Sequence, residues 1–392
     1  MKLSNLVKYN KVVLCLYRLF GNAFVKFLSI FVKVNDKKIL FIDLGGRKYE
    51  RCPKILYERM RDDPFFEDYE FVWAFINPRE HDDIGCRTVK CDTISFLIEA
   101  LSARIWINNS SMERGLKLRR KKTIEFNTWH GTPIKKLGND INDNKSFKSI
   151  TKKIGTQIYC AQSEYDREIF SRIFNVSLEN VIISDMPRND ILANPSISDV
   201  MSTREKLGIS NDKKIILYMP TYREFNKDSS YNCFIKPPID IRKWEKTLGD
   251  KYVLLFRAHY EVTKILGIED SDFIKNVSDY SPLHELLLAS DMLISDYSGS
   301  FFEFGMLERP MFNFAYDYDE YCKYRGLYLD IEKDMGLKIN YDEDSLLKEI
   351  LEMNYEEYCE KTRAFKNKYA PVFGNATETI VEKIKEVLTR EK

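Results

Sequence analysis

The sequence predicts an α/β protein in which two doubly wound domains face a central crevice, with an amphipathic helix in front of them. Three observations predict this class. The chain has 392 residues, which is more than one hydrophobic core usually serves. Short runs of β-branched and aromatic residues alternate with helix-length segments, as they do in parallel sheets that carry helices on both faces. The alternation fades near residues 194–213 and then resumes, which indicates a second domain of the same kind.

The first 33 residues predict a basic amphipathic helix at a membrane surface. They contain six lysines and arginines and no acidic residue. At the helical period one side collects apolar residues, namely Val13, Leu16, Tyr17, Phe20, Phe24, Phe27, Leu28 and Phe31. A basic face beside a large apolar face suits a helix that lies in an anionic membrane surface, although a helix docked on the protein's own core has a similar pattern. Because Arg18, Asn22 and Lys26 interrupt the apolar stretch, we do not expect it to span the bilayer.

The first α/β domain is expected over residues 34–200. Its strand candidates are short apolar runs of the kind found in buried parallel strands, at residues 37–46, 69–78, 103–110 and 122–131. Two segments between them have helical spacing, at residues 51–61 and 93–102. Ligands of such sheets bind beyond the carboxyl ends of the strands, so we expect the functional residues there.

The second domain is expected over residues 201–373. Its strand candidates are residues 213–224, 251–261, 273–280, 291–300 and 309–314, and its helix candidates are residues 281–290 and 300–308. The last segment, residues 374–392, has apolar residues at helical spacing, namely Ile380, Val381, Ile384, Val387 and Leu388. We expect this segment to close the fold as a helix packed on one of the two domains.

Charge and cysteine content narrow the class of protein. Basic and acidic residues nearly cancel, with a formal net charge of +1, so the chain is not a general binder of polyanions and we expect no nucleic-acid partner. Its eight cysteines include no close pair at metal-ligand or redox spacing. This favours reduced, mostly structural thiols in a cytoplasmic protein.

The most informative run is FNTWHGTPIKKLG, residues 126–138. His130 ends a predicted strand, Gly131 allows a sharp turn, and Thr132 suits the start of a helix. The pKa of an imidazole lies near neutrality, so His130 can take a proton from a hydroxyl at the mouth of the crevice. Lys135 and Lys136 add positive charge one turn away, which is useful beside phosphate. The alternative is that His130 only caps the strand and bonds to the backbone.

A second histidine follows another predicted strand, in the run LLFRAHYE. Arg257 and His259 are two residues apart, so they point to the same face of an extended chain. Two cationic or donor side chains on one face make a phosphate clamp. The alternative is an arginine on a solvated edge beside a structural histidine.

A third candidate, after the strand 291–295, is the loop that contains Asp296, Ser298, Gly299 and Ser300. The apolar helix 300–308 follows it. Free backbone N–H groups and hydroxyls at the start of a helix form an anion site. A serine-rich capping turn has the same composition, so this loop alone does not decide between the two.

Two arginines follow proline-marked turns. Arg223 comes shortly after Thr221 in MPTYRE, and Arg188 precedes Asp190 in MPRND. Each arginine is expected either to contact an anionic ligand or to form an interdomain salt bridge, which for Arg188 would be with Asp190.

Four further polar residues carry no functional prediction. Asp317 and Asp319 form a D-x-D pattern in a tyrosine-rich loop, but acidic loops are usually only solvated, so we expect no metal there. His81 and His284 are expected to be structural or surface residues.

Six of these segments, in this order, resemble the CDP-glycerol glycerophosphotransferase family, the teichoic-acid-type primases and polymerases. They are residues 127–138, 186–190, 219–224, 257–260, 295–321 and 325–336. An ordered set of six motifs is far more specific than any one of them. The chain departs from the family's usual residues at Gly299, often Ser, at Glu303, often Asp, and at Met335, often Pro.

The resemblance implies a GT-B-like fold with two Rossmann-type domains, an acceptor domain over 34–200 and a CDP-polyol donor domain over 201–373. It also implies a peripheral enzyme at the cytoplasmic face of the cell membrane, and we expect it to need no cofactor or metal. The substrates would be CDP-glycerol or CDP-ribitol and an undecaprenyl-linked glycan acceptor. A GT-B glycosyltransferase that uses a nucleotide sugar, and a non-catalytic membrane-associated binding subunit, are the other readings.

The resemblance and the local chemistry together give an expected site. His130 and His259 stand where the family's essential histidines stand, and His130 would deprotonate the acceptor hydroxyl. The acceptor-side residues are Gly131, Thr132, Lys135 and Lys136. The donor and phosphate-binding residues are Arg188, Thr221, Arg223, Arg257, Asp296, Ser298, Gly299, Ser300 and Glu303.

Overall fold

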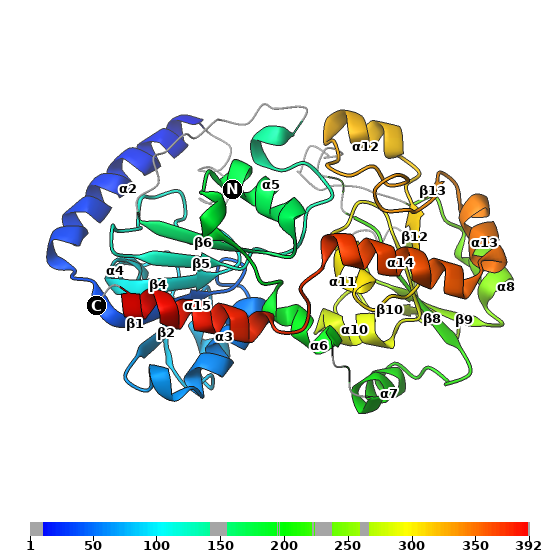
Figure 1. Ribbon diagram of the computed structural model, residues 1–392, viewed down its shortest axis with the longest axis horizontal. Coiled ribbons are helices and arrows are strands. Elements are labelled where there is room, and N and C mark those ends of the chain that lie inside the picture. The colour runs from blue at the N-terminus through cyan, green and yellow to red at the C-terminus, as the bar shows by residue number, and fades with distance from the viewer. Residues whose placement is uncertain are drawn as a thin grey trace.

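The computed structural model describes residues 11–141, 155–193, 195, 197–221, 223, 237–258 and 266–390. Two parallel sheets, each flanked by helices, lie side by side (Figure 1). Their strand orders are β3-β2-β1-β4-β5-β6-β7 and β10-β9-β8-β11-β12-β13. Both follow the order of the doubly wound Rossmann arrangement. We call the units built on these sheets the first and the second domain.

The first sheet is parallel throughout, and its central strands are largely buried. They are β1 (Asn35–Ile42), β2 (Glu70–Phe75), β3 (Arg87–Lys90), β4 (Ala103–Asn108), β5 (Ile124–Asn127), β6 (Thr156–Ala161) and β7 (Val181–Ile183). The helices of this domain are α3 (Arg51–Arg61), α4 (Ile94–Ser102) and α5 (Glu164–Phe174). Separate apolar clusters cover the two faces of the sheet, as buried parallel strands require.

The second sheet is also parallel throughout. Its strands are β8 (Lys214–Met219), β9 (Tyr252–Phe256), β10 (Ile274–Asn276), β11 (Met292–Ser295), β12 (Met311–Phe314) and β13 (Ile339–Asn340). Its helices are α7 (Ile197–Lys206), α8 (Ile241–Leu248), α10 (Leu283–Ala289), α11 (Ser300–Gly305), α12 (Tyr318–Tyr324), α13 (Glu343–Glu352) and α14 (Tyr355–Tyr369). The predicted two-domain α/β class is confirmed.

The last helix, α15 (Ala376–Arg390), returns to the first domain (Figure 1). Ile380, Val381 and Ile384 are fully buried in the core between α3 and the first sheet. The short helix α6 (Asp190–Ala193) leads out of the first domain and begins with Asp190, whose carboxylate accepts hydrogen bonds from the N–H groups of Ala376 and Thr377, both at 2.8 Å. Such a cap satisfies backbone donors that have no partner inside the helix.

A second crossing follows His130. Ile134 is buried in the core of the second domain, although the residues that precede it in sequence belong to the first. Lys135 pairs with Leu327 in an antiparallel bridge. The N–H of Tyr328 donates to the carbonyl of Ile134 at 2.7 Å, and the N–H of Lys136 donates to that of Gly326 at 3.0 Å. The run after the histidine is therefore an extended tie between the domains and not the helix start that the sequence predicts.

The N-terminal helix, α2 (Lys11–Phe31), lies along the outside of the first domain (Figure 1). One face is docked. Val25 is buried, the Tyr17 hydroxyl donates to the Arg114 carbonyl at 3.1 Å, and the Lys117 N–H donates to the Asn22 amide oxygen at 2.7 Å. Tyr17 and Leu28 therefore face the protein and not the predicted apolar surface.

The other face of α2 is apolar and open. Eight large apolar side chains on it are between 41 and 73% exposed, namely Val12, Leu16, Leu19, Phe20, Phe24, Phe27, Ile30 and Phe31. Residues 12–31 are long and apolar enough to cross a membrane, which the sequence reading did not expect. Signal sequences and core helices have the same length and composition, so this property alone assigns no span.

Candidate active site

A cleft of about 340 Å³ lies between the two domains. The ends of strands from both sheets contribute to its wall. Residues at the end of β8 or shortly after β5, β7, β9 and β11 line it, namely His130, Gly131, Arg188, Asn189, Met219, Arg257, Ser298, Gly299 and Ser300. Residues of α3, α6, α10 and α11 form the remaining wall.

His130 has a defined tautomer. Its Nδ1 lies 3.0 Å from the carbonyl oxygen of Asn109, which only accepts hydrogen bonds, so Nδ1 carries the proton. The lone pair of Nε2 is therefore available as a base. Burial lowers the pKa of His130, and the positive charges of Arg188, Arg51 and Lys135 lower it further. The imidazole is consequently neutral at neutral pH although it is exposed toward the cleft.

The backbone around His130 is unusual. Trp129 has a φ of 52°, and Gly131 has a φ of 144°. Positive φ is uncommon for a bulky residue and indicates local strain at a functional turn. The rings of Trp129 and His130 lie 4.0 Å apart between centroids, so the indole supports the imidazole from one side.

Asn109 is itself held by Asp43. The Asn109 amide donates to the Asp43 carboxylate at 2.6 Å and accepts from the N–H of Leu44 at 2.9 Å. Both side chains are fully buried. Burial raises the pKa of Asp43, and the hydrogen bond from Asn109 opposes that rise. Asp43 and Asn109 thus position the carbonyl that orients His130, and the sequence reading missed both.

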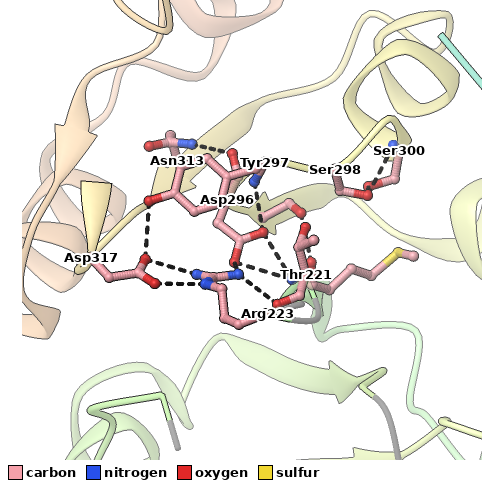
Figure 2. Close-up of polar contacts among 10 residues, drawn as sticks. Thr221, Arg223, Asp296, Tyr297, Ser298, Ser300, Asn313 and Asp317 are labelled. Atoms are coloured by element: carbon pink, nitrogen blue, oxygen red, sulfur yellow. Dashed lines mark hydrogen bonds and ion pairs between the residues drawn. The ribbon is translucent and has the colours of Figure 1, made fainter. Parts of the chain in front are cut away.

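The loop after β11 faces His130 from the second domain. The Ser300 hydroxyl donates to that of Ser298 at 2.9 Å (Figure 2). A Cβ on Gly299 would lie 2.9 Å from the carbonyl oxygen of Thr132, so only glycine fits without displacing one of the two loops. The structure therefore brings the serine loop against the histidine segment.

Arg223 does not line the cleft. Its guanidinium is 1% exposed and donates to both carboxylate oxygens of Asp317, at 2.6 and 2.9 Å (Figure 2). It also lies 2.8 Å from Asp296, and that carboxylate accepts from the N–H of Thr221 at 2.9 Å. The expectation that Arg223, Thr221 and Asp296 contact phosphate is thus replaced by a buried network that braces the loops at the ends of β8 and β11.

Asp317 is committed to this network, since it also accepts from the hydroxyl of Tyr297 at 3.0 Å. Across the described ranges, no group of three or more His, Cys, Asp and Glu side chains is arranged to hold a metal ion.

Arg188 joins the two domains inside the cleft. Its guanidinium is paired with the carboxylate of Glu303 and donates to the carbonyl of His130 at 3.3 Å. Burial alone would lower the pKa of Arg188, but the Glu303 charge outweighs it and raises the pKa. Of the two alternatives for Arg188, the structure has the interdomain salt bridge, with Glu303 in the place of the expected Asp190.

Arg257 lines the cleft from the second domain. Its Nη1 donates to the carbonyls of Val277 and Tyr280, at 2.9 and 2.6 Å. Burial lowers its pKa, the Glu50 charge opposes this, and the Arg51 charge adds to the decrease. The side chain is thus held by neutral carbonyls, which leave its charge available. His259 lies outside the described residues.

Three residues that the sequence places on the acceptor side do not line the cleft. Thr132 is 1% exposed and its hydroxyl donates to Asp166 at 3.0 Å, inside the first domain. Lys135 and Lys136 belong to the tie with residues 326–328 and are not among the residues that line the cleft. The physical reason is Ile134, whose burial in the second core turns the neighbouring lysines away. Gly131 alone of this group borders the cleft.

The sequence reading missed a charged wall. Arg51, Lys54 and Glu58 of α3 and its N-cap residue Glu50 line the cleft, together with His284 from α10. The sequence predicts a helix over residues 51–61 from its apolar spacing alone. The charged residues on the other side of that helix are the feature that could have indicated this wall of the cleft. His284 was expected to be structural or on the surface, and the structure places it at the cleft.

Comparison with known proteins assigns the chain to a family. A profile of the family described as CDP-Glycerol:Poly(glycerophosphate) glycerophosphotransferase matches residues 24–386. The chain is 31% identical over 369 residues to the teichoic acid glycerol-phosphate transferase of Staphylococcus aureus, covering 89% of this chain and 93% of that protein. It is 32% identical over 364 residues to the teichoic acid poly(glycerol phosphate) polymerase of Staphylococcus epidermidis, covering 88% of this chain and 50% of that protein. It therefore spans only half the length of the polymerase.

A solved structure gives the same answer for the fold. The wall teichoic acid polymerase TagF superposes with a TM-score of 0.78 at 30% identity, over 91% of this chain and 90% of that chain. The fold is thus GT-B-like, with two Rossmann-type domains around a central cleft, as the motifs predicted. With its fold, its ordered motifs and a profile match over most of its length, the chain belongs to the CDP-glycerol:poly(glycerophosphate) glycerophosphotransferase family.

Proposed function

We propose that this chain transfers glycerol phosphate from CDP-glycerol to a hydroxyl of a lipid-linked glycan or polyol-phosphate acceptor and releases CMP. The observation that carries the proposal is the arrangement of His130. Its Nδ1 proton is held by the Asn109 carbonyl, so that Nε2 is a neutral base in a cleft that also contains Arg257 and the serine loop. A base and a separate anion site in one cleft suit transfer of a phosphoryl group to a hydroxyl.

In the proposed step, Nε2 of His130 takes the proton of the acceptor hydroxyl, and that oxygen forms a bond to the β-phosphorus of CDP-glycerol. The bond from the β-phosphorus to the bridging oxygen breaks, and CMP leaves with the electron pair. Arg257, the loop of Ser298, and His259 stabilise the charge on the pyrophosphate, which is the main contribution that protein groups make to phosphoryl transfer.

The two domains have separate substrates in this proposal. The domain over residues 34–200, which carries the base, holds the acceptor. The domain over residues 201–373, which carries Arg257 and Ser298, holds CDP-glycerol. Residues 374–392 form the closing helix. Arg188 and Glu303 act across the boundary, since their ion pair sets the distance between the histidine segment and the serine loop.

A membrane surface is the proposed location of the reaction, at its cytoplasmic face. The support is the open face of α2, where side chains such as Phe20, Ile30 and Phe31 are 68, 73 and 68% exposed. An apolar face of this size beside Arg18 and Lys26 matches a helix that lies in an anionic interface. Because the opposite face of α2 is docked on the first domain, we propose that this helix lies parallel to the membrane and holds the enzyme there without a span.

The proposal is tested with purified protein, CDP-glycerol and undecaprenyl-linked acceptors, by measuring CMP release and product mass. His130→Ala should lower acceptor-dependent turnover by about 10²–10⁴-fold, the usual worth of a positioned acid or base, with CDP-glycerol affinity unchanged. Arg257→Ala and His259→Ala should weaken CDP-glycerol binding as well as turnover. His81→Gln, a histidine outside the cleft, is the control. Wild-type turnover by His130→Ala would refute the site.

The donor panel separates the other functions. CDP-ribitol used in preference to CDP-glycerol would make the chain a ribitol phosphotransferase. A nucleotide sugar that yields a nucleoside diphosphate would make it a glycosyltransferase, and no turnover of any donor would leave a binding subunit. Turnover should persist in EDTA because arginine side chains supply the positive charge in the cleft.

A further inference from the structure

Two buried aspartates lie behind the turn that carries His130. Asp185 follows β7, and Asp166 lies in the first turn of α5. The side chains of Gln162 and Thr132 connect the two carboxyl groups by hydrogen bonds, and we call these four residues the aspartate network. Each of the four is at most 1% exposed. Since Thr132 is two residues after His130, the network ends at the segment that carries the proposed base.

The aspartate network lacks one proton when both aspartates are ionised. The Thr132 hydroxyl has one proton but two acceptors, the Asp166 carboxylate at 3.0 Å and the Gln162 amide oxygen. Exchanging the amide oxygen and nitrogen of Gln162 supplies the missing donor, but the amide oxygen then faces the Asp185 carboxylate at 2.9 Å. Two acceptors therefore face each other in either orientation of the amide. A single proton on one of the aspartates removes this conflict.

The contacts of the two carboxyl groups place that proton on Asp185. Asp166 accepts from the N–H groups of Gln162 and Ser163, both at 2.8 Å, and such donors favour the ionised form. One oxygen of Asp185 accepts from Asn189 Nδ2 at 2.7 Å, whereas Oδ2 is buried and has no partner among the described residues. An unpartnered oxygen is more costly on a carboxylate than on a neutral acid. Burial raises the pKa of Asp185 to about 7 and that of Asp166 to about 6, which agrees with this assignment.

The other titratable and charged groups around the two aspartates leave this assignment intact. Those that face Asp185 come from β6 and from the turn after β7, namely Cys160, Arg188 and Asp190. The positive charge of Arg188 is paired with Glu303, and the negative charge of Asp190 adds to the effect of burial on the pKa of Asp185. Tyr165, on α5, faces Asp166.

Asp185 supports two parts of the cleft wall. Through Gln162 and Thr132 it reaches the turn of His130, which packs on the serine loop. Asn189, which donates to Asp185, lines the cleft itself. A negative charge on Asp185 would leave two acceptors facing each other behind the turn of His130. This repulsion would displace the turn, and a shift of about 1 Å at a reacting group can lower a rate by about 10²-fold.

We propose that Asp185 is a positioning residue for the transfer reaction, a neutral carboxylic acid that donates to Gln162 and so holds the turn of His130 against the serine loop. The inference rests on the proposed function and adds to it a residue that touches neither substrate. Turnover then requires two protonation states, because His130 must be neutral and Asp185 must keep its proton. The rate should therefore fall at alkaline pH as well as at acidic pH.

Two substitutions test the proposal by CMP release between pH 6 and 9. Asp185 has a φ of 62°, a left-handed conformation that asparagine and glycine adopt readily. Asp185→Asn keeps a donor that does not titrate. Its kcat/KM at pH 7 should lie within about twofold of the wild type and should persist at pH 8.5, where the wild type should have lost about tenfold. Asp185→Gly removes the side chain and should lower kcat/KM by about tenfold at every pH, with CDP-glycerol affinity unchanged.

The matched control is Asp63→Asn, in the first domain. Asp63 is ion-paired with Arg59 and Lys385 and does not line the cleft, so the pH profile of this variant should follow that of the wild type. Circular dichroism checks that each variant is folded. Infrared difference spectra between pH 6 and 9 give a readout that does not depend on turnover. The carbonyl stretch of a protonated carboxyl group should disappear with rising pH in the wild type, and Asp185→Asn should lack this change.

Three results would overturn the inference. They are an alkaline limb that persists in Asp185→Asn, a loss of turnover in Asp185→Asn as large as in Asp185→Gly, and the absence from the wild type of a carboxyl band that titrates in this range. If the band titrates in the wild type and not in Asp185→Asn, but no CMP is released from CDP-glycerol, the proposed donor is wrong and the proton on Asp185 stands.

Discussion

A single imidazole shows how several buried groups can determine one protonation state. The carbonyl of Asn109 fixes the proton on Nδ1 of His130, and the carboxylate of Asp43 fixes Asn109. Neighbouring cations and partial burial then disfavour the second proton. The hydrogen bond to Asn109 by itself raises the pKa of His130, but burial and the neighbouring cations outweigh it, so the ring is neutral with a free Nε2, which is the form that a base requires.

The pH dependence of turnover follows from this. Because the pKa of His130 is lowered from its ordinary value of 6.5, the active neutral form persists below that pH. We expect the acidic limb of kcat/KM to have its midpoint below 6.5, and we expect Arg51→Gln to move it upward, since one repelling cation is removed. Initial rates between pH 5 and 8 measure both. A limb centred above 6.5 in the wild type would contradict the lowered pKa.

Gly299 gives a second prediction at this scale. A side chain there would press on the carbonyl of Thr132, at 2.9 Å from the new Cβ. Although the family often has serine at this position, Gly299→Ser should destabilise this chain by about 1–3 kcal/mol, the usual cost of overpacking, and should lower turnover by displacing the serine loop. Denaturant unfolding and CMP release measure the two effects. An unchanged midpoint with full activity would show that the loops have room.

The predictions made from the sequence succeeded where a residue ends a buried strand. His130, Arg257 and Ser298 are at strand ends, and the apolar runs before them predicted their place in the cleft. Arg51 and His284 were missed because they lie on helices, whose polar faces are usually solvated. Arg223 was misplaced because its acidic partner, Asp317, lies 94 residues away in sequence, and only the folded chain brings them together.

Burial explains only part of which strands the sequence predicts, because β6 is buried and is not among the strand candidates, whereas the edge strand β10 is. The central strands β1, β4, β8 and β11 are continuous apolar runs and were all predicted. The edge strand β3 was not, since it reads RTVK and only its valine is buried. β7, with three residues, is too short for a periodic signal. Strands of this kind form because a neighbouring strand offers hydrogen bonds, and local sequence does not record this.

Helix α2 has an apolar face that the rest of the protein leaves largely uncovered. Its apolar face is wider than one core contact needs, and it is open over most of the helix. Single substitutions on that face change no internal packing. Such substitutions therefore test binding of this face to a membrane without changing the stability of the fold.

We therefore expect Leu19→Gln and Ile30→Gln to weaken binding to phosphatidylglycerol vesicles by roughly tenfold each, the worth of one buried aliphatic side chain. The thermal midpoint should not change, because these side chains are 63 and 73% exposed. The matched control is Leu351→Gln, on α13 of the second domain, which is 53% exposed. Co-sedimentation measures binding. Equal binding by all variants, or a wild type that stays soluble at low salt, would refute the membrane role of α2.

At the scale of the whole molecule, the domains share parts. The last helix completes the core of the first domain, and its start is capped by Asp190, at the exit from that domain. The MPRND motif thus contributes one side chain to the cleft, Arg188, and another to the attachment of α15. The sequence reading treated the two as one pair.

Asp190→Ala tests this division. Loss of the cap should lower the free energy of unfolding by about 0.5–2 kcal/mol, with CDP-glycerol affinity unchanged, because Asp190 does not line the cleft. Limited proteolysis should release the C-terminal helix earlier than in the wild type. Asp342→Ala removes the cap of α13 within the second domain and is the control that should leave α15 protected. A loss of donor affinity in Asp190→Ala would return this residue to the site.

The tie formed by residues 134–136 and 326–328 also restricts how the enzyme can move. Separating the domains along it would expose Ile134 and break its backbone hydrogen bonds, whereas a rotation about it would leave them intact. We therefore expect any motion between the domains to be a rotation about this tie. In the proposed reaction, the opposite side of the cleft, where Ser281 and Glu50 meet in one hydrogen bond, would open most in such a rotation. Because His130 lies only four residues from Ile134, we expect the distance between the base and the serine loop to change little in such a rotation.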